Sequence, residues 1–328
     1  MQVPLWIWLL TAFGFVALLA LSFLMHVRKA HAPTLAEAGI WTAVFVALSV
    51  IFGVGIGVVW TPAHALEYFA GYITEYSLSI DNLFVFVLIM GGFAVPRIHQ
   101  ERVLMVGIAI ALVLRTVFIL LGAAAIARFS WVFYLFGLFL ILTGAKLAVG
   151  KHEDSDEYEP NFLVRAVGKC LPVSPDYDGA RLTTRLHGRF AVTPMLMVML
   201  TIGFTDILFA LDSIPAIYGL TNVPYIVFGT NAFALLGLVE LYFLIGGLLK
   251  RLVYLSVGLA LILAFIGIKL VIEALHGNNL PFLNGGDPIH LLPEIPTWLS
   301  LVIILAILTV TTVASLLKNR SDARLSAG

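Results

Sequence analysis

Two segments of this chain carry the same pattern of polar side chains within apolar surroundings. In each, a threonine precedes a carboxylate, and a second carboxylate follows six residues after the first, with an amide or hydroxyl side chain directly behind it. The residues are Thr74, Glu75, Asp81 and Asn82 in the first copy, and Thr205, Asp206, Asp212 and Ser213 in the second. A charged side chain in hydrocarbon costs several kcal/mol, so such residues are rare and usually functional. We therefore expect these acids to form a binding site.

The spacing divides each motif between two faces of a helix. Residues six apart differ by about 240° around an ideal helix, so Glu75 and Asp81 cannot both face one ligand from an unbroken helix. Residues seven apart share a face, which groups Thr74 with Asp81 and Glu75 with Asn82. Either the helix unwinds locally, or its two faces serve different partners.

Pro215 favours a break in the second copy. Proline has no N–H, so the carbonyl of Leu211 would lose its helical donor close to Asp212. Unwound carbonyls and carboxylates together form cation sites in transporters. Carboxylate, amide, hydroxyl and carbonyl oxygens suit Mg²⁺, Ca²⁺ or Mn²⁺. The motifs contain neither cysteine nor histidine, which argues against Zn²⁺ or Cu⁺.

Three polar residues outside the motifs are further candidates. Asn231 could supply an oxygen ligand or make a polar contact between helices, and Glu240 is also intramembrane. Arg115 could be the counter-charge of an empty site. The alternative for the whole set is that these groups only join helices together or neutralise Arg115.

The elements that must position these residues are membrane helices. The chain of 328 residues is 61% hydrophobic and 12% charged, whereas a soluble domain has about 25% charged residues. Its net charge is zero, so nothing indicates nucleic-acid binding. Cys170 is the one cysteine, which excludes an internal disulfide. Without a CxxC pair, a haem pair or a nucleotide loop, we do not expect an enzyme or a tightly bound cofactor.

About 20 apolar residues cross a bilayer as a helix, and the sequence predicts an all-α, polytopic bundle of about nine transmembrane helices. Their expected ranges are 4–25, 38–59, 66–94, 103–126, 129–149, 193–218, 224–249, 252–274 and 297–317. With nine spans, the basic connections fall on one side, and the connection 275–296 on the other side has no Lys or Arg. This predicts a multi-pass protein of a bacterial inner (plasma) membrane, with the N-terminus outside and the C-terminus cytoplasmic.

An internal repeat relates the two motifs. They lie in the third and sixth spans, which run in opposite directions, and Gly144 and Lys146 of the fifth span are echoed by Gly267 and Lys269 of the eighth. Spans three to five and six to eight thus form a 3+3 inverted repeat, an arrangement that places ion sites near the midplane. The expected units are two N-terminal helices (1–65), the first repeat (66–149), a cytoplasmic loop (150–192), the second repeat (193–274), an outer loop (275–296), and the last helix with its tail (297–328).

Charged residues also occur near the ends of spans. Lys146 lies near the cytoplasmic end of its span and Lys269 near the outer end, and we expect both to extend to the interface. Glu67 and His64 lie near the outer boundary. They could form a vestibule, but an interfacial location explains them equally well.

The motifs resemble the signatures of the TerC family. The matching segments are 71–86, 209–217 and 226–238, and the similarity covers roughly residues 40–275. This resemblance implies a multi-pass inner-membrane protein related to the tellurite-resistance protein TerC and to Alx, the latter associated with manganese export and alkaline response. The wider grouping includes LysE-like exporters.

Three positions depart from the family pattern. The family commonly has Glu where this chain has Gly203, Arg where it has Val239, and Lys where it has Tyr76. Loss of the acid and the arginine together could be compensatory, or the metal preference could differ.

These observations predict a Mn²⁺-type divalent cation exporter whose carboxylates also exchange protons. The expected metal ligands are Glu75, Asp81, Asn82, Asp206, Asp212, Ser213 and Asn231, with support from Thr74, Thr205, Arg115, Leu211, Pro215 and Glu240. The expected partners are the lipid bilayer, the metal ion and protons, and the oligomeric state is left open. The alternative is a membrane component of tellurite or envelope stress resistance without transport activity, for which the acids are dispensable and the loop 150–192 is essential.

Overall fold

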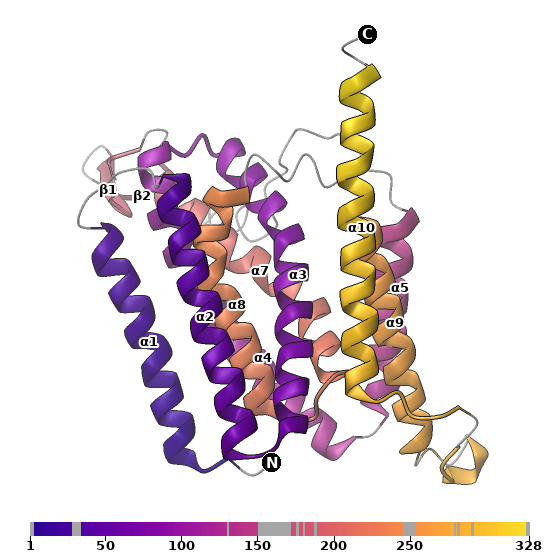
Figure 1. Ribbon diagram of the computed structural model, residues 1–328. Coiled ribbons are helices and arrows are strands. Elements are labelled where there is room, and N and C mark those ends of the chain that lie inside the picture. Colours follow the sequence, from indigo (N-terminus) through magenta and orange to yellow (C-terminus); the bar gives the residue numbers. More distant parts are fainter. Residues whose placement is uncertain are drawn as a thin grey trace.

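The computed structural model describes residues 3–27, 34–129, 131–149, 172–174, 177–179, 181–186, 189–245, 254–278, 280, 283–289 and 292–325. Nine helices within these ranges are long and apolar enough to cross a membrane, which confirms a polytopic all-α bundle. They are α1 (Leu5–Val27), α2 (Leu35–Val59), α3 (Pro62–Gly92), α4 (Arg97–Arg128), α5 (Val132–Val149), α7 (Pro194–Tyr218), α8 (Pro224–Ile245), α9 (Leu255–His276) and α10 (Thr297–Leu325) (Figure 1).

Helix starts follow local sequence signals. Thr34 caps α2 in a capping box with Glu37, and Thr61 caps α3 just before Pro62. Proline suits the first turn of a helix because the N–H that it lacks would have no partner there. The same reason explains why α7 begins at Pro194.

A small β-hairpin precedes α7. Strands β1 (Thr183–Leu186) and β2 (Arg189–Val192) pair antiparallel, an element that the sequence did not predict. Of the predicted loop 150–192, residues 150–171 lie outside the described ranges. The hairpin and the C-terminus lie at one end of the bundle, and the N-terminus lies at the other (Figure 1). We call these the hairpin end and the far end.

Helices α3 and α7, which carry the two motifs, are antiparallel. The hydroxyl of Tyr177, in the segment before β1, donates a hydrogen bond to the carbonyl of Phe93 at 2.7 Å. The carboxyl end of α3 therefore lies at the hairpin end, where α7 begins directly after β2. This is the relative direction that an inverted repeat requires.

The packing of the two helix triplets is also reciprocal. Helix α3 packs against α8 as α7 packs against α4, and α5 packs along α9. At the α5–α9 contact, a Cβ on Gly137 would lie 2.8 Å from the carbonyl oxygen of Gly267, and a Cβ on Gly267 would lie 2.7 Å from that of Gly137. A Cβ on Gly144 would lie 2.8 Å from the carbonyl oxygen of Ala260. The two helices thus touch through their backbones.

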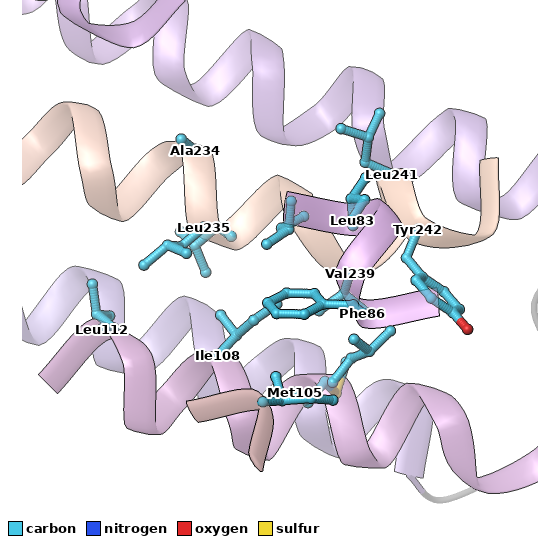
Figure 2. Close-up of a cluster of buried hydrophobic side chains, with 14 of the residues drawn as sticks. Leu83, Phe86, Met105, Ile108, Leu112, Ala234, Leu235, Val239, Leu241 and Tyr242 are labelled. Carbon is cyan, nitrogen blue, oxygen red and sulfur yellow. The ribbon is translucent and has the colours of Figure 1, made fainter. Parts of the chain in front are cut away.

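Two of the departures from the family pattern lie in tightly packed regions. Val239 of α8 is 5% exposed and belongs to the apolar cluster that includes Phe86 of α3 and Met105 of α4 (Figure 2). A Cβ on Gly203 of α7 would lie 2.8 Å from the side chain of Ile110 on α4. Apolar packing therefore occupies the region where the family pattern has an arginine and an acid.

Candidate functional site

A buried arginine lies between the two motifs. Arg115 of α4 is 1% exposed, and its guanidinium contacts side chains from three other helices. Nε donates to Asp206 Oδ2 at 2.6 Å and Nη2 to Asp206 Oδ1 at 2.9 Å. Nη1 donates to Glu75, to Asn231 Oδ1 at 2.8 Å and to Ser213 Oγ at 3.3 Å. We call these five residues the Arg115 cluster.

The first acid of each motif supplies the charge of this cluster. Asp206 receives two parallel hydrogen bonds from the guanidinium, the bidentate geometry that makes arginine–carboxylate pairs strong. Glu75 and Asp206 are 0% and 1% exposed. With both acids ionised, two negative charges face one positive charge, so the Arg115 cluster carries a net charge of −1.

Two buried oxygen atoms on α3 make no hydrogen bond within the described structure. They are Oε2 of Glu75 and Oγ of Ser79, one helical turn further along. Leaving a buried polar group without a hydrogen bond costs about 1–3 kcal/mol, so the presence of two such atoms requires an explanation. Both can accept a cation or a proton donor. The sequence analysis did not select Ser79, although its spacing of four residues from Glu75 indicated the shared face.

The threonine side chain of the first motif bonds to the backbone of its own helix. Thr74 donates from Oγ1 to the carbonyl of Ala70 at 2.8 Å, and Thr230, beside Asn231, donates to the carbonyl of Val227 at 2.9 Å. Asn231 also donates from Nδ2 to the carbonyl of Val227 at 2.9 Å, which turns its oxygen towards Arg115. The predicted supporting residue Thr205 is buried on α7.

The expected break at Pro215 is wrong. Helix α7 runs from Pro194 to Tyr218 with Pro215 inside it, so the backbone beside Leu211 and Asp212 is helical and not unwound. Proline removes one hydrogen bond, and packing of α7 against α4 and α3 maintains the helix. Helix α3 is likewise continuous. In the second motif the two faces therefore serve different partners, since Asp206 and Ser213 bond to Arg115 and Asp212 interacts with Lys146.

The second acid of the second motif lies apart from Arg115. Asp212 is partly exposed and interacts electrostatically with Lys146 of α5. Glu240 is 1% exposed on α8, and Asn82 is 7% exposed on α3. In the described structure, no hydrogen bond joins Asp212 or Asn82 to the guanidinium of Arg115. Asp81 belongs to α3, but its side chain lies outside the described part of the structure.

The arrangement is not a ready-made cage of metal ligands. Among the described side chains, no group of three or more His, Cys, Asp or Glu is placed to hold a metal ion. The Arg115 cluster instead pairs two carboxylates with a cation of the protein and adds one amide and one hydroxyl oxygen. An ion that binds there has to take over the charge interaction of Arg115.

Comparisons with known proteins identify several relatives. The profile of the integral membrane protein TerC family matches residues 60–323. An uncharacterized membrane protein of Mycobacterium tuberculosis is 48% identical over 321 residues, covering 97% of this chain and 81% of that protein. Alx of Escherichia coli strain K12, provisionally named a membrane-bound redox modulator, is 39% identical over 264 residues, covering 78% of this chain and 82% of Alx. No solved structure matches the chain.

Proposed function

Because this chain belongs to the TerC family of integral membrane proteins, we propose that it transports a divalent cation of the Mn²⁺ type across the membrane. The observation that carries this proposal is the meeting of Glu75 and Asp206, the first acids of the two motifs, at one buried arginine. A site at the contact between two antiparallel helix triplets is the arrangement that transporters with inverted repeats use.

We assign Arg115 the role of resident cation in the ion-free protein. It neutralises part of the charge of Glu75 and Asp206, which would otherwise be two unpaired carboxylates in a low-dielectric interior. An incoming divalent cation competes with the guanidinium for the same oxygens. Protons can compete as well, which is the basis for the proposed exchange of a cation for protons.

The remaining polar groups supply oxygen ligands along the path. Asn231 and Ser213 already belong to the Arg115 cluster, and Oε2 of Glu75 accepts no hydrogen bond in the described structure. We also assign Asp81 and Asn82 of α3 and Asp212 of α7 to the path of the ion. Carboxylate, amide and hydroxyl oxygens suit Mn²⁺, Mg²⁺ and Ca²⁺. The choice of Mn²⁺, and export as the direction, come from the family resemblance.

The name given to Alx raises a second function, redox modulation in the membrane. A thiol mechanism within one chain requires two cysteines, and this chain has Cys170 alone. A stress-resistance role without transport is the other alternative. It predicts that neutral replacements of Glu75 and Asp206 leave the phenotype unchanged, whereas transport requires both acids.

The test is Mn²⁺ uptake into inverted membrane vesicles, in which export from a cell is measured as uptake. We expect Glu75→Gln and Asp206→Asn each to abolish uptake above that of vesicles without the protein. Glu37→Gln is the matched control, because Glu37 is an acid in the first turn of α2 at the hairpin end, remote from Arg115. If Glu75→Gln and Asp206→Asn both take up Mn²⁺ as fast as Glu37→Gln does, the proposed site is refuted.

A further inference from the structure

A polar cavity lies at the far end of the bundle, apart from the Arg115 cluster. Its volume is about 560 Å³, and it is formed by the start of α3, the α7–α8 connection, the last turns of α9 and the segment before α10. The polar residues that line it are Glu67, Thr221, Asn222, Lys269, Glu273, Glu294 and Thr297. Glu67 precedes Glu75 by eight residues on α3. The cavity is therefore separated from the Arg115 cluster by about 12 Å along the helix axis.

Neutral side chains hold two carboxylates in this cavity. Thr221 donates from Oγ1 to Oε2 of Glu67 at 2.6 Å. Asn222 donates from Nδ2 to Oε1 of Glu273 at 2.8 Å. Each carboxylate is thus positioned through one oxygen, and its other oxygen is available to a ligand.

A buried lysine lines the same cavity. Lys269 is 8% exposed, so the expectation that it extends to the interface is wrong. It interacts electrostatically with Glu273 and Glu67, but its Nζ makes no hydrogen bond within the described residues. Its Nζ is not among the buried atoms that lack a hydrogen-bond partner in the described structure, so the ammonium group faces the open space of the cavity between the two carboxylates, where water or a polar ligand can reach it.

The charges of the cavity favour a cation. Glu67, Glu273 and Lys269 together sum to −1. Glu294 adds a further negative charge at the rim, where it is 83% exposed and lies 3.5 Å from His276. The cavity is also much larger than a bare ion. Six waters occupy about 180 Å³, so a hydrated ion fits with room to spare.

We propose that this cavity binds a hydrated divalent cation between Glu67 and Glu273, with Lys269 as the internal cation that opposes it. Two carboxylates are too few for a full oxygen shell, so the ion keeps several of its waters, as small divalent cations readily do. The cavity is a site additional to the Arg115 cluster and rests on the proposed function only for the choice of Mn²⁺ as the probe. The N-terminus lies at the same end, so with the predicted orientation, in which the N-terminus is outside, this is the side to which export would deliver the ion.

The test is Mn²⁺ binding to the purified full-length chain in detergent, followed by the loss of the free-ion signal in electron paramagnetic resonance. We expect Glu67→Gln and Glu273→Gln each to weaken one class of bound Mn²⁺ by at least about tenfold, since each removes a charge close to the ion. We expect Lys269→Met to tighten the same class several-fold. Lys269→Arg keeps the charge and should bind as the unmodified chain does.

Opposite effects of the acid and lysine variants separate a charge effect from damage to the fold, because misfolding weakens binding in both. Equal binding in Glu67→Gln, Glu273→Gln and the unmodified chain would overturn the proposal, as would weaker or unchanged binding in a folded Lys269→Met. Vesicle uptake distinguishes the two hypotheses. Glu75→Gln should lose transport and retain the Mn²⁺ class at the far end. Normal transport in Glu75→Gln would contradict the proposed function alone, and loss of the far-end Mn²⁺ class in Glu75→Gln would contradict the cavity site alone.

Discussion

Replacement of Arg115 by methionine tests the electrostatic argument most directly. The guanidinium makes two hydrogen bonds to Asp206 and one to Glu75, and all three side chains are at most 1% exposed. Removing the guanidinium changes the net charge of the buried cluster from −1 to −2. Loss of one partner from a buried ion pair costs about 3–5 kcal/mol. That is a large share of the roughly 5–15 kcal/mol that stabilises a protein.

The assay is the temperature at which half of the detergent-purified protein loses its monodisperse peak in size-exclusion chromatography. We expect Arg115→Met to lower this temperature by several degrees or to prevent isolation of the protein. Arg128→Met is the matched control, since Arg128 is an exposed arginine at the end of the same helix. It should change stability by no more than about 1 kcal/mol.

A triple variant makes the prediction specific to charge. Arg115→Met combined with Glu75→Gln and Asp206→Asn removes the two carboxylates together with their partner, and neutral replacement of a complete buried ion group is often tolerated. We expect this variant to regain most of the stability lost in Arg115→Met, while transport stays absent. The reasoning is refuted if Arg115→Met is as stable as the unmodified chain, or if the triple variant is no more stable than Arg115→Met.

Three further outcomes follow from the structure. Glu75→Gln should cost less stability than Arg115→Met, about 1–2 kcal/mol in the same thermal assay, because it leaves one acid paired with one arginine. Gly137→Ala should destabilise the chain by about 1–3 kcal/mol, since the new Cβ would lie 2.8 Å from a backbone oxygen of α9. Gly14→Ala is its control and should be neutral or slightly stabilising, because a Cβ at Gly14 would have no atom within 4 Å. Gly203→Glu restores the acid of the family pattern. It should reduce the yield of folded protein on membrane extraction, because even its Cβ would lie 2.8 Å from an isoleucine of α4. A normal yield would show that α4 and α7 can separate at this point.

Much of the bundle could be predicted because hydropathy and length determine which segments can span a membrane. The selection of Glu75, Asp206 and Arg115 also followed from sequence, since charged residues inside apolar spans are conspicuous. The structure brings these three together with Asn231 and Ser213. The roles of Glu75, Asp206, Asn231 and Ser213 as metal ligands stay predictions.

Other features could not be predicted because they depend on how the helices are rotated and packed. The interpretation of Pro215 considered one lost hydrogen bond and not the neighbouring helices that maintain α7. Lys269 has the same type and position in its span as a lysine that extends to water, but the α7–α8 connection and the segment before α10 enclose it. The burial of Val239 and Gly203 likewise required knowledge of the α4 surface that they face.

The hydrogen bonds of Arg115 have a mechanical consequence. Two bonds to Asp206, one to Ser213 and one to Asn231 connect α4 to the triplet α7–α9, and the bond to Glu75 stays within the triplet α3–α5. Any rocking of one triplet against the other must break or rearrange the first four. We therefore expect an unloaded protein to resist changing conformation, because no ion is present to draw the acids away from the guanidinium. In an energised membrane, that resistance would suppress futile cycling and keep the ion gradients from leaking through an empty carrier.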